Sequence, residues 1–222
     1  MKPIGYIHSD FTEKFGIPRQ AGVIDTLKAT IVFEPEYRNY DAFRYIEEFS
    51  HIWVIWEFSK AKKKNVSLTV RPPRLGGNRR VGVFATRSPF RPNPIGLSCV
   101  RLDRVERTEN DGVILHISGA DMLSGTPVYD IKPYLPYTDC HPEATGGFTE
   151  GLQDGNLSVE LCDMPFEMED NIIQNLVKVL SHDPRPSYQS EPDRVYGMEF
   201  AGLSVKFTVN GKLIKVVSVE KI

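Results

Sequence analysis

The residues with the clearest capacity for chemistry are basic side chains concentrated in one window of the chain. Between Lys60 and Arg91 there are ten basic residues and no acidic one, whereas the whole chain has a formal net charge of -2. Most basic stretches are only solvated surface, but the absence of any counter-charge here favours a polyanionic partner such as RNA. The ten residues are Lys60, Lys62, Lys63, Lys64, Arg71, Arg74, Arg79, Arg80, Arg87 and Arg91.

All six of these arginines fall in one segment of unusual composition, residues 71–98. It reads RPPRLGGNRRVGVFATRSPFRPNPIGLS. Proline and glycine punctuate the arginines, so guanidinium groups are expected on loops of defined shape, where they can approach phosphates. Phe84 and Phe90 could add stacking surface for bases, and the alternative is that they are core residues.

Two further segments carry candidate binding residues. The first, residues 121–139, reads DMLSGTPVYDIKPYLPYTD. Its Ser-Gly-Thr-Pro turn could hold an adenosine-like ligand through exposed backbone groups, and the spacing of Asp130, Lys132, Tyr134 and Tyr137 directs several of them to one side of an extended chain. A packed sheet edge explains this pattern equally well. The second, FGIPRQAG at residues 15–22, indicates on its own only a turn with one arginine.

Several reaction classes are excluded by missing motifs. The chain has no GxGxxG after a first strand, no GxxxxGK[ST], no GxSxG and no HExxH. Three cysteines form no CxxC pair, so neither a disulfide framework nor a metal site is expected. No segment has the length of apolar residues that a membrane helix or a secretion signal needs, which predicts a soluble, cytoplasmic protein.

The elements that must position these segments are mainly strands. Alternating or continuous apolar patterns predict strands at residues 4–9, 26–34 and 51–58, with further strands between residues 79 and 123 and a hairpin turn at Asn110–Gly112. Helical spacing predicts a short helix at residues 40–49. The strand at residues 51–58 is buried on both faces or lies at an interface. Many short strands with little helix indicate a closed antiparallel β-barrel.

The composition changes after Tyr137, where many turn residues predict a linker or long surface loop. We place a boundary near residue 155, which divides the chain into a barrel domain at 1–155 and a small α+β domain at 156–222. In the latter, apolar spacing predicts a helix around residues 168–180 that ends at Asp183-Pro184. Asn210-Gly211 predicts a type I′ turn in a closing hairpin.

The segments PRQAG, RPPRLGGNRRVGVFATRSPFRPNPIGLS and SGTPVYDIKPYLPY together resemble the signature of the TrmO, or YaeB-like, family. The resemblance covers residues 4–139, and DPRPSY at residues 183–188 extends it more weakly into the C-terminal part. It implies a β-barrel methyltransferase unrelated to the Rossmann type. It also implies a homodimer that uses S-adenosyl-L-methionine to methylate the exocyclic nitrogen of threonylcarbamoyl-adenosine, 3′ of the anticodon in tRNA.

The same resemblance implies which residues line the S-adenosyl-L-methionine site. They are Gln20, Ala21, Gly22, Ser59, Lys60, Arg87, Leu97, Ser124, Gly125, Thr126 and Pro127. This chain departs from the family at two places. Ser59-Lys60 replaces a frequent His-Gln, and Ser124 replaces a frequent Asp, so contacts there are expected to run through backbone atoms.

Methyl transfer from a sulfonium needs mainly alignment and exclusion of water, because the donor is already a strong electrophile. If a general base acts, Asp130 is the candidate. A fixed cation should bind the carboxylate of the threonylcarbamoyl group, and we expect Lys132 or Arg91, with Asn93 and Tyr134 nearby. Contacts to anticodon-stem phosphates are expected from four arginines, Arg71, Arg74, Arg79 and Arg80.

Two other functions fit the same residues. A non-catalytic RNA-binding module would use the basic stretch equally well, and a methyltransferase of the same fold could act on a different acceptor. Binding of S-adenosyl-L-methionine separates the first alternative from an enzyme, and nucleoside analysis of tRNA separates the second.

Overall fold

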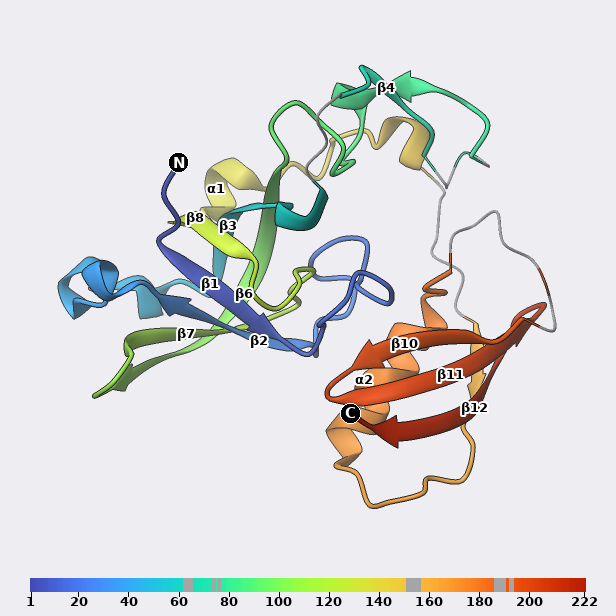
Figure 1. The fold of residues 1–222 in the computed structure, drawn as a ribbon. Coiled ribbons are helices and arrows are strands. Elements are labelled where there is room, and N and C mark those ends of the chain that lie inside the picture. Colours follow the sequence, from blue (N-terminus) through green and yellow to red (C-terminus); the bar gives the residue numbers. More distant parts are fainter. Residues whose placement is uncertain (62–65, 73–74, 76, 151–156, 186–190, 192–193) are drawn as a thin grey trace.

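The computed structural model describes residues 1–61, 66–72, 75, 77–150, 157–185, 191 and 194–222. The described chain forms a barrel in its first part and a smaller sheet-and-helix unit in its second (Figure 1). The predicted boundary near residue 155, together with Lys62, Lys63, Lys64 and Arg74, lies outside the described residues. Within the described ranges no helix is both long and apolar enough to cross a bilayer.

Six strands close the barrel in the order β1-β2-β7-β6-β3-β8, as predicted from the many short apolar runs. All of their pairings are antiparallel. The strands are β1 (Gly5–Ser9), β2 (Lys28–Phe33), β3 (His51–Glu57), β6 (Ile95–Thr108), β7 (Gly112–Ser118) and β8 (Pro127–Pro133). The predicted hairpin turn at Asn110–Gly112 joins β6 to β7, and Gly112 adopts a positive φ of 65° there.

Strand β3 shows how the barrel separates its interior from its outer face. Ile52, Val54 and Trp56 are buried, whereas Trp53 and Ile55 are half-buried on the outside. Successive side chains of a strand point to opposite faces, so the apolar run fills the core and also leaves apolar side chains outside. Gly96 pairs with Trp56, and a Cβ built on Gly96 would lie 2.2 Å from the indole ring. Only glycine leaves room for Trp56 in the interior.

The helix predicted at residues 40–49 is wrong. The segment forms two 3-10 turns, η2 (Tyr40–Phe43) and η3 (Ile46–Glu48), which follow a third, η1 (Pro35–Tyr37). Arg44 is extended and Tyr45 is left-handed, with φ of 70°, so the helical hydrogen-bond ladder cannot continue. Phe43 instead packs edge-on against Phe33, with ring centroids 4.7 Å apart. Tertiary packing of this aromatic pair outweighs the local helical period.

Shorter elements lie between the barrel strands and after the last of them. The two-stranded ribbon of β4 and β5 projects from the barrel and carries part of the basic segment (Figure 1). Between β3 and β6 lie η4 (Ser59–Ala61), β4 (Thr69–Val70), β5 (Val81–Gly82) and η6 (Val83–Ala85), and after β8 lie α1 (Pro136–Asp139) and η7 (Gly147–Thr149).

The second part, here called the C-terminal unit, comprises β9–β12 and helix α2. Its sheet has the order β10-β11-β12-β9, and α2 has an apolar face formed by Leu176, Val179 and Leu180. The predicted helix and closing hairpin are both present. Their bounds are β9 (Ser158–Glu160), α2 (Asp170–Ser181), β10 (Tyr196–Phe200), β11 (Leu203–Asn210) and β12 (Leu213–Lys221).

The turn of that hairpin differs from the predicted type I′ turn. Asn210 pairs with Leu213, so the two loop residues are Gly211 and Lys212, one position later than expected. Of these, Gly211 alone has a positive φ, 57°, which is the pattern of a type II′ turn. The register of β11 and β12 decides which two residues turn, and the Asn-Gly dipeptide does not.

Candidate functional site

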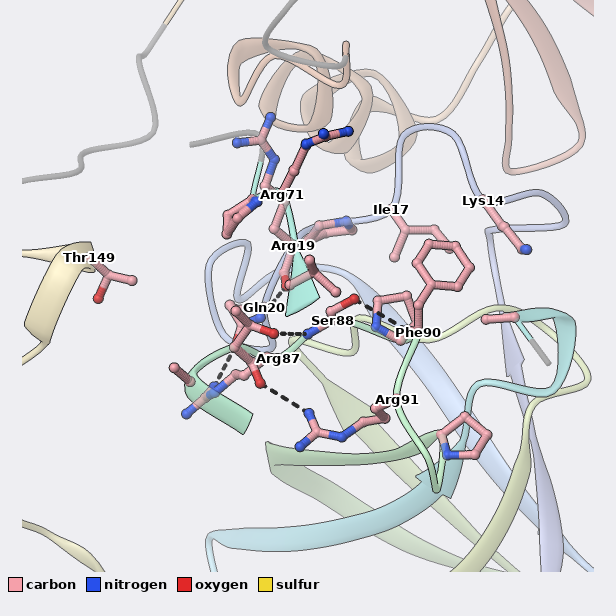
Figure 2. A pocket seen from close by; sticks show the side chains of 18 of the residues that line it. Lys14, Ile17, Arg19, Gln20, Arg71, Arg87, Ser88, Phe90, Arg91 and Thr149 are labelled. Atoms are coloured by element: carbon pink, nitrogen blue, oxygen red, sulfur yellow. Dashed lines mark hydrogen bonds between the residues drawn. The ribbon is translucent and has the colours of Figure 1, made fainter. Parts of the chain in front are cut away.

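A large cavity lies where the barrel, the β4–β5 ribbon and the C-terminal unit meet. Its volume is about 1660 Å³, and among the described residues its lining includes seven cationic and two acidic side chains. The acidic residues are Glu57 and Asp183. Figure 2 shows Arg19, Gln20, Arg71, Arg87 and Arg91 gathered in this space. The cations are Lys14, Arg19, Arg71, Arg80, Arg87, Arg91 and Arg185.

The three segments singled out in the sequence meet beside this cavity. The Arg87 guanidinium of the second segment donates to the Gln20 side-chain oxygen of the first (Figure 2). The Gly22 N–H donates to the Gly119 carbonyl at 2.9 Å, just before the third segment. A Cβ built on Gly119 would lie 3.2 Å from Gly22, so the two backbones are in close contact. Residues separated by about 100 positions therefore form one site.

A half-buried carboxylate supports this junction from behind. Asp121 Oδ1 accepts a hydrogen bond from Ser98 Oγ at 2.6 Å, and Ser98 Oγ accepts one from the Trp56 indole N–H at 3.0 Å. Burial raises the pKa of Asp121, while Ser98, the Ala21 N–H and the charge of Arg87 act in the opposite direction. Asp121 thus links the barrel interior to the loop that carries Gln20 to Gly22.

A second carboxylate, Glu57, lies at the end of β3 and lines the cavity. It accepts a hydrogen bond of 2.5 Å from the Tyr129 hydroxyl, and this bond to the ionised carboxylate raises the pKa of Tyr129 to about 12. Because the bond favours the neutral phenol, Tyr129 is a donor at neutral pH. The bond orients Glu57 at the edge of the cavity.

Exposed aromatic rings accompany the cations. Phe84 is 75% exposed and Phe90 is 43% exposed, and both line the cavity. The alternative that they are core residues is wrong for both. Local side-chain bonds shape the loop that carries Phe90, since the Phe90 N–H donates to Ser88 Oγ at 3.2 Å and Arg91 donates to the Thr86 carbonyl at 3.0 Å (Figure 2). Cations and ring faces together suit a single-stranded nucleic acid.

The other residues expected at the donor site are more dispersed. Ser59 and Lys60 lie in η4, where the Lys60 carbonyl accepts from Lys14 Nζ at 2.6 Å. The N–H groups of Ser124, Gly125 and Thr126 all donate to backbone carbonyls of this chain, and Pro127 is buried. A ligand at this turn would therefore have to bind atoms other than these three N–H groups. Leu97 lies on the outer face of β6 and is 56% exposed.

The residues expected to act on the acceptor fall into two groups. Arg71, Arg80 and Arg91 line the cavity, whereas Arg79 and Asn93 are exposed on the loops nearby. Asp130, Lys132 and Tyr134 are carried by β8 and the residue after it, on the outer side of the barrel. Asp130 pairs with Lys132 at 2.8 Å, and the Tyr134 ring packs against Trp53 at 5.9 Å between centroids.

Sequence reasoning assigned no site role to several residues that the structure brings to the cavity. Lys14 and Arg19 belong to the loop between β1 and β2, and Asp183 and Arg185 belong to the C-terminal unit. Asp121 opens the third segment and lies behind the cavity. Except for Lys14, which lies just before the first segment, the available signal was their place in the quoted segments, because a charged residue in a turn does not indicate which distant element it faces.

Two family descriptions match this chain and together span most of it. The tRNA-methyltransferase O N-terminal domain matches residues 6–140, and the TrmO C-terminal domain matches residues 157–222. The chain belongs to the tRNA-methyltransferase O family. The resemblance inferred from the three segments is therefore confirmed, and so is the expectation of an enzyme at the level of the family.

Individual relatives agree over nearly the full length. A tRNA (adenine(37)-N6)-methyltransferase of Escherichia coli is 38% identical over 98% of this chain and 96% of its own. A Pseudomonas aeruginosa protein named as a putative S-adenosylmethionine-dependent methyltransferase is 40% identical over 92% of this chain and 90% of its own. The crystal structure of TrmO from Pseudomonas aeruginosa superimposes with a TM-score of 0.74 at 33% identity, covering 98% of this chain and 97% of that chain. The predicted β-barrel fold is thereby confirmed.

Proposed function

We propose that this protein transfers a methyl group from S-adenosyl-L-methionine to the exocyclic nitrogen of adenosine 37 in tRNA, and that its acceptor is threonylcarbamoyl-adenosine. The observation that carries the proposal is a cationic, aromatic cavity at which two family segments are joined by the Gln20–Arg87 hydrogen bond. Asp121, the first residue of the segment 121–139, lies behind this contact and accepts a hydrogen bond from Ser98. Relatives named as tRNA (adenine(37)-N6)-methyltransferases support the position and the base.

The residues around Gln20 to Gly22 suit a donor site. A Cβ built on Gly22 meets no atom within 4 Å, so a ligand can approach the backbone there. Arg87 can hold the carboxylate of the donor, and Ser59 and Lys60 extend the site along η4. When bound, S-adenosyl-L-methionine supplies an activated methyl group. The protein then has to align the acceptor nitrogen and exclude water.

The acceptor is proposed to enter from the side of the basic loops. Phe84 and Phe90 offer ring faces for unstacked anticodon-loop bases, and Arg71 and Arg80 offer charge to the backbone phosphates. Arg91 is the lining cation best suited to the threonylcarbamoyl carboxylate, because its bond to the Thr86 carbonyl holds its guanidinium in place.

We also propose that two copies of the chain pair through the outer face of β3, β6 and β8. Trp53, Ile55 and the exposed Leu97 form an apolar strip there, next to Asp130 and Lys132. Pairing would bring these expected site residues to a partner's cavity and cover the strip. Leu97→Glu should convert a dimer to a monomer in light scattering and reduce activity, and a monomeric wild type would overturn this assignment.

Reconstitution with purified components tests the reaction. The chain is incubated with S-adenosyl-L-methionine and tRNA carrying threonylcarbamoyl-adenosine, and nucleosides are then analysed by mass spectrometry. One added methyl group on that nucleoside is expected, with none on matched tRNA that lacks the threonylcarbamoyl group. Methylation of the tRNA that lacks the threonylcarbamoyl group would refute threonylcarbamoyl-adenosine as the required acceptor. Absence of heat on titration with S-adenosyl-L-methionine would refute the proposed methyltransferase activity and favour a non-catalytic RNA-binding module.

A further inference from the structure

The loop between β1 and β2, residues 10–27, carries the Gln20 to Gly22 segment but packs mainly on the C-terminal unit. Phe11, Ile24 and Leu27 are buried in the same apolar cluster as α2 and strands β10–β12, separate from the barrel core. The Phe11 ring lies 5.4 Å from that of Phe200. Phe15 stacks on Tyr196 and Phe207 at 6.5 and 6.3 Å.

Polar contacts hold both ends of this loop to the same unit. At its start the Ala201 N–H donates to the Asp10 carbonyl at 2.9 Å, and Thr12 Oγ1 donates to Glu199 at 2.6 Å. At its end Thr26 Oγ1 lies 2.6 Å from the Asn175 side-chain oxygen. Both ends of the loop are therefore set by residues more than 140 positions away in the sequence.

The middle of the loop meets a charged clamp at the end of α2. Arg185 forms a two-point pair with Asp183, at 2.9 and 3.0 Å, and its side chain is only 11% exposed. The Arg185 carbonyl accepts a hydrogen bond of 3.4 Å from Arg19, the residue before Gln20. Asp183 has a φ of 49°, a conformation that Asp and Asn tolerate better than most residues.

We propose that the C-terminal unit positions the donor-binding loop, with Asp183 and Arg185 as positioning residues for Arg19 and Gln20. The unit acts through Gln20, whose partner Arg87 belongs to the barrel side of the cavity. Its role is therefore to complete the site, in addition to any contact with RNA. This inference rests on the proposed function only in taking residues 20–22 as part of the donor site.

Asp183→Asn tests the clamp in the full-length protein, because Asn keeps the backbone preference and removes the charge that holds Arg185. Glu191→Gln is the matched control, since it removes a charge from an exposed pair with Arg194 in the same unit. Hydrogen exchange of residues 10–27 should accelerate in Asp183→Asn alone. The dissociation constant for S-adenosyl-L-methionine should rise about fivefold or more, the lower end of typical coupling between sites.

Two readouts separate failure of this inference from failure of the proposed function. Unchanged hydrogen exchange of the loop in Asp183→Asn overturns the positioning role. The positioning role is also overturned if Asp183→Asn speeds exchange without changing the affinity for S-adenosyl-L-methionine, while Gln20→Ala lowers that affinity. If Gln20→Ala has no effect on donor affinity, the proposed donor site fails, and the exchange result still decides whether the clamp holds the loop. A thermal melt of each variant confirms that it is folded.

Discussion

The salt dependence of RNA binding offers a quantitative test of the cavity as the tRNA site. Asp183 neutralises Arg185, Arg19 bonds the Arg185 carbonyl, and Arg87 and Arg91 are assigned to carboxylates, which leaves three lining cations for phosphates: Lys14, Arg71 and Arg80. Each phosphate neutralised on a single strand contributes about -0.7 to the slope of log K against log salt. Three such contacts give a slope of about -2, so affinity should fall about 20-fold between roughly 50 and 200 mM salt.

Binding of a labelled anticodon stem-loop, followed by fluorescence anisotropy across this salt range, measures the slope. Arg71→Ala should make the slope shallower by about 0.7 while weakening all sequences alike. Arg44→Ala is the control, because Arg44 is an exposed arginine paired with Asp41 and does not line the cavity. A wild-type slope shallower than about -1, or equal effects of the two substitutions, would refute the cavity as the phosphate-binding site.

Three further predictions follow from individual contacts. Gly96→Ala should lower stability by about 1–3 kcal/mol through overlap with Trp56, and an unchanged melting temperature would contradict the packing. Tyr129→Phe should cost about 1.5–3 kcal/mol in urea unfolding at neutral pH, because it removes a bond to a charged group. The raised pKa means that this contribution is complete below pH 10 and lost as the pH rises through about 12, so a constant difference from wild type would refute the bond. Asp121 has a raised pKa, so its burial penalises stability as the pH rises above 3.8. Asp121→Asn should therefore gain stability relative to wild type over that rise, and a parallel pH profile would contradict this.

The barrel and the closing hairpin could be predicted from the sequence because apolar and polar residues alternate along a strand that is buried on one face. The basic window and the three family segments were likewise visible, since charge and turn chemistry are local properties. These features predicted the family, the fold and the cation-rich character of the cavity. Gln20 and Arg87, which line it, were both among the residues expected at the donor site.

The local sequence pattern gave wrong predictions where contacts with residues distant in the chain outweigh it. The spacing of residues 40–49 is helical, but Phe43 packs on Phe33 and Tyr45 takes a left-handed conformation. The Asn210-Gly211 pair suggested one turn, whereas the pairing of β11 with β12 moved the turn by one residue. Propensity contributes a few tenths of a kcal/mol for each residue, so packing and register outweigh it.

Tertiary structure alone decided which segments share the site and which core each apolar side chain joins. Hydrophobicity favours apolar packing of Phe11 and Phe15, but it does not show that both pack on the C-terminal unit. A register shift between Ile55 and Trp56 in the pairing of β3 with β8 similarly helps determine where Asp130 lies. Because side chains alternate along a strand, a shift of one residue exchanges the two faces, and only the assembled barrel determines the result.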